Sequence, residues 1–278
     1  MEPELQNIAF FQSSHLAAKV AKHLPKVDHP GRPSGLMWNV DGLLAFKDTG
    51  GFFLMTDVLV LPQPVTSHVL AILMTSWCGR LKQLAYTRVK MSTFNGQEIH
   101  RPMAMLLEWL RGKGMGRQVL ALVSDENAVN AQLAEFGYPL LADLRHLERR
   151  LSGVGHADQL LTYIYGRATF SVGDWRDKWA QAQHQCEQLP AEARRITALQ
   201  MHGMRQVLEA RFRVSDQPFR FAEANNDLLE GVGKKWANVV KRIGEETGDA
   251  MGEVERHKFV RRVVGLLTLT EQLGFNPF

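Results

Sequence analysis

The sequence predicts an α+β protein, with a small antiparallel or mixed sheet and flanking helices followed by an all-helical bundle. Short apolar runs separated by turn residues recur over residues 52–91 and again at 119–123, which is typical of strands. Beyond residue 140, apolar residues recur at three- and four-residue spacing, which indicates helices packed along one side. This change of pattern predicts a boundary near residue 150, between an α/β domain at 1–150 and a helical-bundle domain at 151–278.

The first half begins with a helix and continues as a sheet. Apolar spacing predicts an amphipathic helix over 12–24 that ends at Pro25, because proline lacks the N–H that a helix interior needs. Asn95 and Gly96 both tolerate the positive φ of a two-residue turn, so they predict a hairpin with basic outward positions. Helices are expected on one face of the sheet, whose strands are predicted over 52–55, 58–61, 69–75 and 82–91.

Turn and capping residues set the remaining boundaries. Pro102 ends the predicted hairpin and leads into a helix over 103–111. A glycine-rich basic loop at 112–117 then joins a strand over 119–123. Ser124 and Asp125 are suited to cap a helix that stops at Gly137. Helices follow over 143–151, 157–165, 174–189, 191–212, 221–244 and 252–273.

The composition is that of a globular protein that folds without a metal or a disulfide. Of the 278 residues, 45% are apolar and 22% are charged, which allows a sizeable core. Cys78 and Cys186 each lack a second cysteine at ligand spacing, as expected in a reducing compartment. Residues 1–4 do not resemble a secretory signal, and no apolar run is long enough to cross a bilayer. We therefore expect a soluble cytoplasmic protein without a membrane partner.

Basic residues are concentrated in one central segment. Residues 80–117 contain eight Lys and Arg against two Glu and so carry +6, whereas the whole chain carries a formal charge of +4. Such a surface suits phosphate groups, although a solvated sheet face and loop explains the charges equally well. The candidates for phosphate contact are Arg80, Lys82, Arg88, Lys90, Arg101, Lys113 and Arg117.

A second basic cluster lies towards the carboxyl terminus. Lys234 and Lys235 precede Lys241 and Arg242 by seven residues each, so the four cations follow one side of a helix. Trp236 lies beside them, and an aromatic neighbour suits contact with a nucleic-acid backbone or an unpaired base. The alternative is an ordinary amphipathic helix that buries this tryptophan.

No catalytic motif is recognisable. The loop at 112–116 lacks the Gly-Lys-Ser/Thr ending of a phosphate-binding loop, and the ten histidines do not show the spacing of a zinc site. Asp41, Asp48 and Asp57 fall in predicted loops, without the signature of a metal-dependent nuclease. We therefore expect a non-catalytic protein with no bound metal and no cofactor.

Residues 69–102 resemble part of a known family. The segment VLAILMTSWCGRLKQLAYTRVKM, which leads through FNGQEIHRP, is similar to the large-subunit-like protein of plasmid-borne type IV CRISPR effector complexes. The chain departs from many members in lacking a cysteine-rich zinc-binding element near its front, where it has Trp38 and Asp41. The resemblance implies a subunit of a ribonucleoprotein complex for antiviral defence, which binds guide RNA, other subunits and double-stranded target DNA.

The resemblance also assigns contacts to particular residues. A member of this family helps to read a short duplex motif beside the target, and Asn, Gln and Arg can pair with base edges. The residues implied in duplex contact are Arg80, Lys82, Arg88, Lys90, Asn95, Gln97 and Arg101. Those implied in contact with RNA or a displaced strand are Lys234, Lys235, Lys241 and Arg242.

Two other functions remain open at the level of sequence. One is a stand-alone DNA-binding accessory protein of a plasmid or phage, such as a regulator or replication factor. The other is a metal-dependent nuclease or nucleotidyl-transfer enzyme that uses Asp57, His68 and Asp41.

Overall fold

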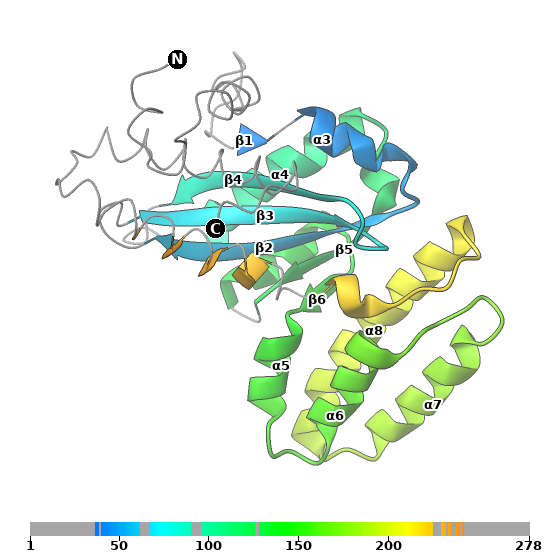
Figure 1. Ribbon diagram of the computed structural model, residues 1–278. Coiled ribbons are helices and arrows are strands. Elements are labelled where there is room, and N and C mark those ends of the chain that lie inside the picture. Colours follow the sequence, from blue (N-terminus) through cyan, green and yellow to red (C-terminus); the bar gives the residue numbers. More distant parts are fainter. Residues whose placement is uncertain are drawn as a thin grey trace, which may run out of the picture.

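The protein combines a mixed sheet with a group of helices, which confirms the α+β class (Figure 1). The computed structural model describes residues 37–38, 40–61, 67–89, 96–125 and 128–224, together with 229–231, 233–234, 237–238 and 241. The helices predicted over 12–24 and 252–273 lie outside these residues. Among the described residues, no helix has the length and apolar character needed to cross a membrane.

The six-stranded sheet has the order β1-β4-β3-β2-β5-β6. Strands β2, β3 and β4 form an antiparallel meander, and β1 pairs antiparallel to β4. After the crossover through α4, strand β5 returns parallel to β2, and β6 lies parallel to β5. The strands are β1 (Met37–Trp38), β2 (Phe52–Leu61), β3 (Ser67–Ser76), β4 (Lys82–Val89), β5 (Val119–Ser124) and β6 (Leu140–Ala142).

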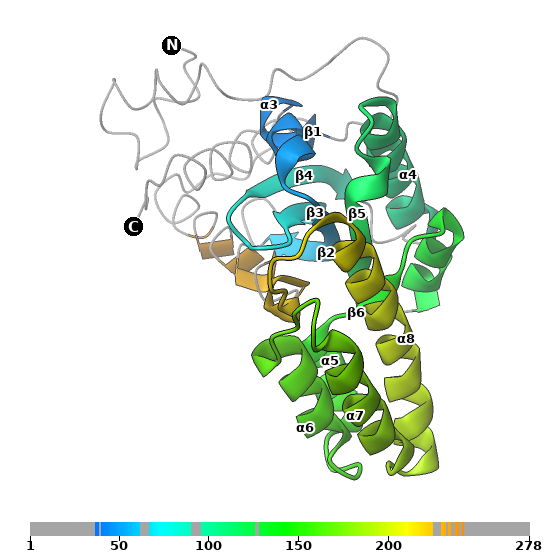
Figure 2. The same cartoon turned by 90° about the vertical axis from the view of Figure 1, so that its right-hand side faces the viewer.

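Helices lie on both sides of the sheet, so the expectation of helices on one face alone is wrong. Helices α3 and α4 lie on one side, and α5 to α8 extend from the β6 side as a bundle (Figures 1 and 2). The α-helices are α3 (Val40–Leu44), α4 (Gly96–Gly112), α5 (Leu144–Leu151), α6 (Ala157–Thr162), α7 (Trp175–Glu187) and α8 (Ala191–Val214). Shorter helical turns are η1 (Ala45–Asp48), η3 (Gly116–Gln118), η4 (Ala128–Phe136), η5 (Tyr163–Arg167) and η6 (Phe221–Ala224).

Alternating side chains of β2 supply two hydrophobic cores. Phe52 and Leu54 pack with the buried residues of α4, whereas Phe53 and Met55 belong to a larger cluster with α5 to α8 and η6. This alternation follows from the two-residue period of a strand, which turns neighbouring side chains to opposite faces. The sheet and the helices α5 to α8 therefore share the larger core. The domain boundary predicted near residue 150 stays a prediction.

The predicted hairpin at Asn95-Gly96 is wrong. Gly96 is the first residue of α4, which runs to Gly112 with Pro102 inside it, so Gln97 and Arg101 lie on a helix. Tertiary packing outweighs the turn preference and the hydrogen bond lost at the proline. The residues responsible recur at helical spacing and are all buried: Ile99, Met103, Leu106, Leu107 and Leu110.

Strand β2 also differs from expectation. The two short runs predicted at 52–55 and 58–61 form one ten-residue strand, so Asp57 lies in its interior and not in a loop. The polar residue does not break the strand, because every residue from Phe52 to Leu61 pairs with β3.

Later boundaries follow the sequence more closely. Asp143 and Asp174 are the N-cap residues of α5 and α7, and the strand predicted over 119–123 is β5. The segment after Ser124 ends at Gly137 as predicted, where φ is +74°, but it is the 3-10 turn η4. The helix predicted over 221–244 starts as the 3-10 turn η6, and the residues described beyond it, at 229–231, 233–234, 237–238 and 241, are helical.

Arg211 is an unusual member of the larger core. Its side chain is fully buried on α8, and its Cζ lies 3.9 Å from the centroid of the Trp77 ring. Nη1 donates a hydrogen bond to the Ser215 carbonyl at 3.3 Å. Among the described residues, Nε and Nη2 have no hydrogen-bond partner, and burial lowers the pKa of this guanidinium.

We expect Arg211→Met to keep or raise the stability, and Arg211→Ala to lower it by about 2–4 kcal/mol. Methionine fills a similar volume without burying a poorly hydrogen-bonded charge, whereas alanine leaves a cavity beside Trp77. Urea unfolding of the two variants and the wild type measures the difference. Equal destabilisation by both substitutions would show that the charge itself stabilises the core.

Candidate metal site at the carboxyl ends of the parallel strands

Three potential metal ligands lie where the two parallel strands β5 and β6 end. Asp125 directly follows β5, and Asp143 directly follows β6. His146 lies in the first turn of α5, for which Asp143 is the N-cap. The carboxyl ends of neighbouring parallel strands meet at one edge of a sheet, a common position for ligand sites in α/β folds.

The ligand atoms of these three residues all lie within 4.8 Å of one another. His146 Nε2 is 3.4 Å from Asp125 Oδ1 and 3.7 Å from Asp143 Oδ2. The Asp143 side chain is buried, whereas 31% of the Asp125 side chain and 38% of the His146 side chain are exposed. The cluster is thus anchored in the protein on one side and open to solvent on the other.

Asp57 adds a third carboxylate beside this cluster. It lies two residues beyond Met55, which pairs with Val123, while Asp125 lies two residues beyond Val123 on the neighbouring strand. Burial, and then the charge of Asp125, raise the pKa of Asp57 to about 7. Its Oδ1 accepts a hydrogen bond from the Val58 N–H at 2.6 Å.

Glu230 brings further negative charge to the same place. It raises the pKa of both Asp57 and Asp125, although burial has the largest effect on each. Its carboxylate lies 3.8 Å from Arg145 Nη1 and 3.8 Å from Lys234 Nζ. The site therefore holds several carboxylates close together with basic side chains at its border.

Buried hydrogen bonds hold the ends of β5 and β6 in place. The Asp143 N–H donates to the Ser124 carbonyl at 3.0 Å. Ala142 donates its N–H to Gln200 Oε1 at 2.8 Å, and its carbonyl accepts from the Tyr165 hydroxyl at 3.2 Å. Such supporting contacts fix the direction of the neighbouring ligands, which a metal site requires.

The basic residues predicted from sequence are divided between the two ends of the sheet. Four of them are exposed at the end where β2, β4 and β5 begin: Arg80, Lys82, Lys113 and Arg117. We call these four the basic edge. The segments that carry these residues are neighbours at this end of the sheet. The Trp77 N–H donates to the Gly51 carbonyl at 3.0 Å, and Phe52 at the start of β2 pairs with Val119 at the start of β5.

The other predicted residues do not join the basic edge. Arg101 is exposed on α4, and Lys234 and Lys241 are exposed in the last described segment, where Lys234 lies beside Glu230. Arg88 and Gln97 belong to β4 and α4, but their side chains are not described. Outside the described residues lie Lys90, Asn95, Lys235, Trp236 and Arg242.

The sequence carries a signal for this site that is not a recognised metal-binding motif. Ser124-Asp125 and Ala142-Asp143 each place an aspartate directly after an apolar run, a pattern that also fits a helix cap at Asp125 and a helix start at Asp143. His146 has no second histidine at ligand spacing in the sequence, because its partners in the fold are aspartates. Of the residues proposed for a nuclease, Asp57 adjoins the cluster, whereas Asp41 lies on α3 and His68 near the start of β3.

Two carboxylates and one imidazole can bind a divalent cation. Oxygen-rich sites suit Mg²⁺ and Mn²⁺, and an added imidazole favours transition metals such as Mn²⁺ over Ca²⁺. Comparison of the chain with family models, curated proteins and solved structures finds no match.

Proposed function

We propose that this chain is a divalent-cation-dependent phosphodiesterase that acts on nucleic acid. The observation that carries the proposal is the convergence of Asp125, Asp143 and His146 within 4.8 Å at the ends of two parallel strands. These residues bind the cation, and Asp57 supplies an adjoining carboxylate that can reach the cation or its bound water. This proposal differs from the non-catalytic function expected from the sequence, which remains a prediction.

The reaction is hydrolysis of a phosphodiester. A cation held by Asp125, Asp143 and His146 would make water a better nucleophile and would screen the charge of the phosphate. The oxygen of a water molecule attacks phosphorus, and the water releases a proton to solvent. The bond between phosphorus and the leaving ester oxygen breaks, and this oxygen keeps the electron pair and takes a proton from water. The products are a phosphomonoester and an alcohol.

Charge supports nucleic acid as the substrate. Arg145 and Lys234 each lie 3.8 Å from the Glu230 carboxylate, next to the metal-site carboxylates. A phosphate that approaches the cation therefore meets basic side chains. The basic edge and the formal charge of +4 extend this character over the molecule. Basic residues that face phosphates provide most of the sequence-independent affinity for nucleic acids.

Incubation of the purified protein with labelled single-stranded DNA, duplex DNA and RNA tests the proposal. We expect cleavage with Mn²⁺ or Mg²⁺ and none with EDTA. Calorimetry with Mn²⁺ should detect binding in the absence of substrate. A protein that neither binds Mn²⁺ nor cleaves any of the three substrates is not this enzyme.

A second candidate is the non-catalytic subunit of an RNA-guided complex that the sequence resemblance implies. The observation that favours it is the basic edge, which gathers four of the predicted phosphate contacts at one end of the sheet. Purification from the native host distinguishes the candidates. Discrete guide-like RNA with several partner subunits supports this function, and sequence-specific DNA binding by the isolated protein supports a stand-alone DNA-binding factor.

We expect Lys113→Ala combined with Arg117→Ala to weaken duplex DNA binding and to reduce the slope of log affinity against log salt by about 2, because each phosphate contact contributes about 0.9. Both side chains are exposed, so the fold should be unaffected. Fluorescence anisotropy over a salt series measures the slope. The control is Arg194→Ala with Arg195→Ala, which removes two exposed charges from α8; an equal loss in the control would exclude the basic edge as the contact.

A further inference from the structure

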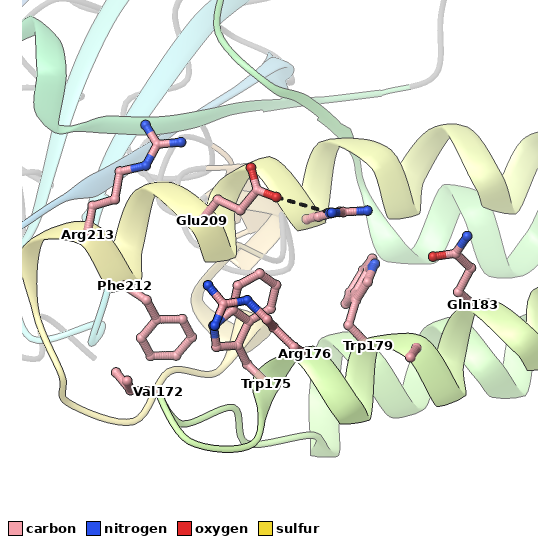
Figure 3. A pocket seen from close by; sticks show the side chains of 10 residues that line it. Val172, Trp175, Arg176, Trp179, Gln183, Glu209, Phe212 and Arg213 are labelled. Carbon is pink, nitrogen blue, oxygen red and sulfur yellow. Dashed lines mark hydrogen bonds and ion pairs between the residues drawn. The ribbon is translucent and has the colours of Figure 1, made fainter.

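A cleft between α7 and α8 combines aromatic and basic side chains. Its volume is about 490 Å³, within the range of small-molecule sites. Figure 3 shows aromatic side chains from both helices directed into it. The residues that matter most are Trp175, Trp179, Phe212, Arg176, Arg205 and Arg213.

Planar groups gather at one end of the cleft. The rings of Trp175 and Phe212 lie 6.1 Å apart between centroids, at an interplanar angle of 20°. The Arg176 guanidinium lies 4.9 Å from the centroid of the Trp175 ring. Because every nucleobase has a flat π-face, such an arrangement of rings and guanidinium can stack an unpaired base.

The charge of the cleft is positive. Arg205 Nε lies 3.0 Å from Glu209 Oε1, so this pair is balanced. Among the described residues, Arg176 and Arg213 have no acidic partner, and both are exposed. An uncharged apolar ligand would leave these two cations uncompensated, whereas a phosphate beside the base complements them.

We propose that this cleft binds an unpaired nucleotide of a single-stranded nucleic acid. The base lies against the half-buried Phe212 ring and the exposed Arg176 guanidinium, which covers the buried Trp175. Arg176 and Arg213 contact the adjoining phosphates. Bases of an intact duplex remain stacked on their neighbours and cannot enter. The inference does not rest on the metal site, because the cleft lies on other elements and binds without a cation.

Fluorescence anisotropy with a labelled 12-nucleotide single strand, in the presence of EDTA, tests the inference. We expect Arg176→Ala with Arg213→Ala, and separately Phe212→Leu, to weaken binding by about 10-fold or more. Leucine at 212 keeps an apolar side chain in the half-buried position but removes the stacking surface. Tryptophan fluorescence should be quenched by the strand in the wild type and less in the variants.

Arg194→Ala with Arg195→Ala is the matched control, because it removes two exposed arginines near the start of α8, whereas α8 lines the cleft only from Arg205 onward. Equal weakening in this control would overturn the inference, and so would equal affinity for a blunt duplex. Competition by adenosine monophosphate as effective as competition by an unlabelled strand would assign the cleft to free nucleotides instead. EDTA keeps this result separate from cleavage, so either proposal can fail without the other.

Discussion

Asp125→Asn is expected to weaken Mn²⁺ binding and to reduce phosphodiester cleavage by about 100-fold or more, because it replaces a charged ligand by a neutral amide. Asparagine has nearly the same shape, so the strand ends should remain in place. Burial raises the pKa of Asp125, so loss of its charge should not lower the stability. Calorimetry with Mn²⁺ and single-turnover cleavage measure the two effects, and thermal unfolding shows whether the variant is folded.

Asp177→Asn serves as the control, because Asp177 is exposed on α7, outside the cluster. It removes the same charge and should leave both measurements unchanged. His146→Gln should behave like Asp125→Asn, since it removes the imidazole that lies 3.4 Å from Asp125 Oδ1. Cleavage that survives both variants would assign the activity to another part of the chain.

The sequence predicted the elements of the fold better than their arrangement. Apolar periodicity identified β5, α5, α7 and α8, because it is a local signal. The hairpin at Asn95-Gly96 failed because the turn preference of two residues competes with burial of a whole helix face. Apolar residues at helical spacing begin at Ile99, but Pro102 argued against a helix there because proline is disfavoured inside helices.

The candidate site could not be predicted from local sequence patterns either, because its residues are distant in the sequence. Asp57, Asp125 and Asp143 lie 86 residues apart at the extremes, and only the parallel pairing of β2, β5 and β6 brings them to one edge. Strand order depends on contacts between segments that are distant in the sequence, and the apolar periodicity of each segment does not predict those contacts. The basic residues were found because charge can be counted, yet their division between the two ends of the sheet also depends on topology.

Asp57→Asn is expected to raise the free energy of unfolding at pH 8 by up to about 4 kcal/mol, because each unit of pKa shift corresponds to about 1.4 kcal/mol. In the folded protein the pKa of Asp57 is about 7, above its ordinary value of 3.8, so the folded state holds this proton more tightly than the unfolded state. The contribution of Asp57 to stability is thus fully present below pH 3.8 and is lost as the pH rises through 7. Asparagine has no such proton and still accepts the Val58 hydrogen bond. Urea unfolding from pH 4 to pH 8 measures the difference.

Asp174→Asn provides a comparison with the opposite sign. Hydrogen bonds from the Lys178 side chain and then from Ser171 lower the pKa of Asp174 to about 2, so its contribution is present above pH 3.8 and is lost only as the pH falls through 2. We compare the dependence of the unfolding free energy on pH in the two variants. If it becomes flatter between pH 4 and 7 in Asp57→Asn, but not in Asp174→Asn, the loss of stability at high pH comes from the carboxylate cluster. If these carboxylates gather to bind a cation, Mn²⁺ should offset that cost and raise the Tm at pH 8 more in the wild type than in Asp57→Asn. Equal increases would show that Asp57 lies beyond the reach of the cation.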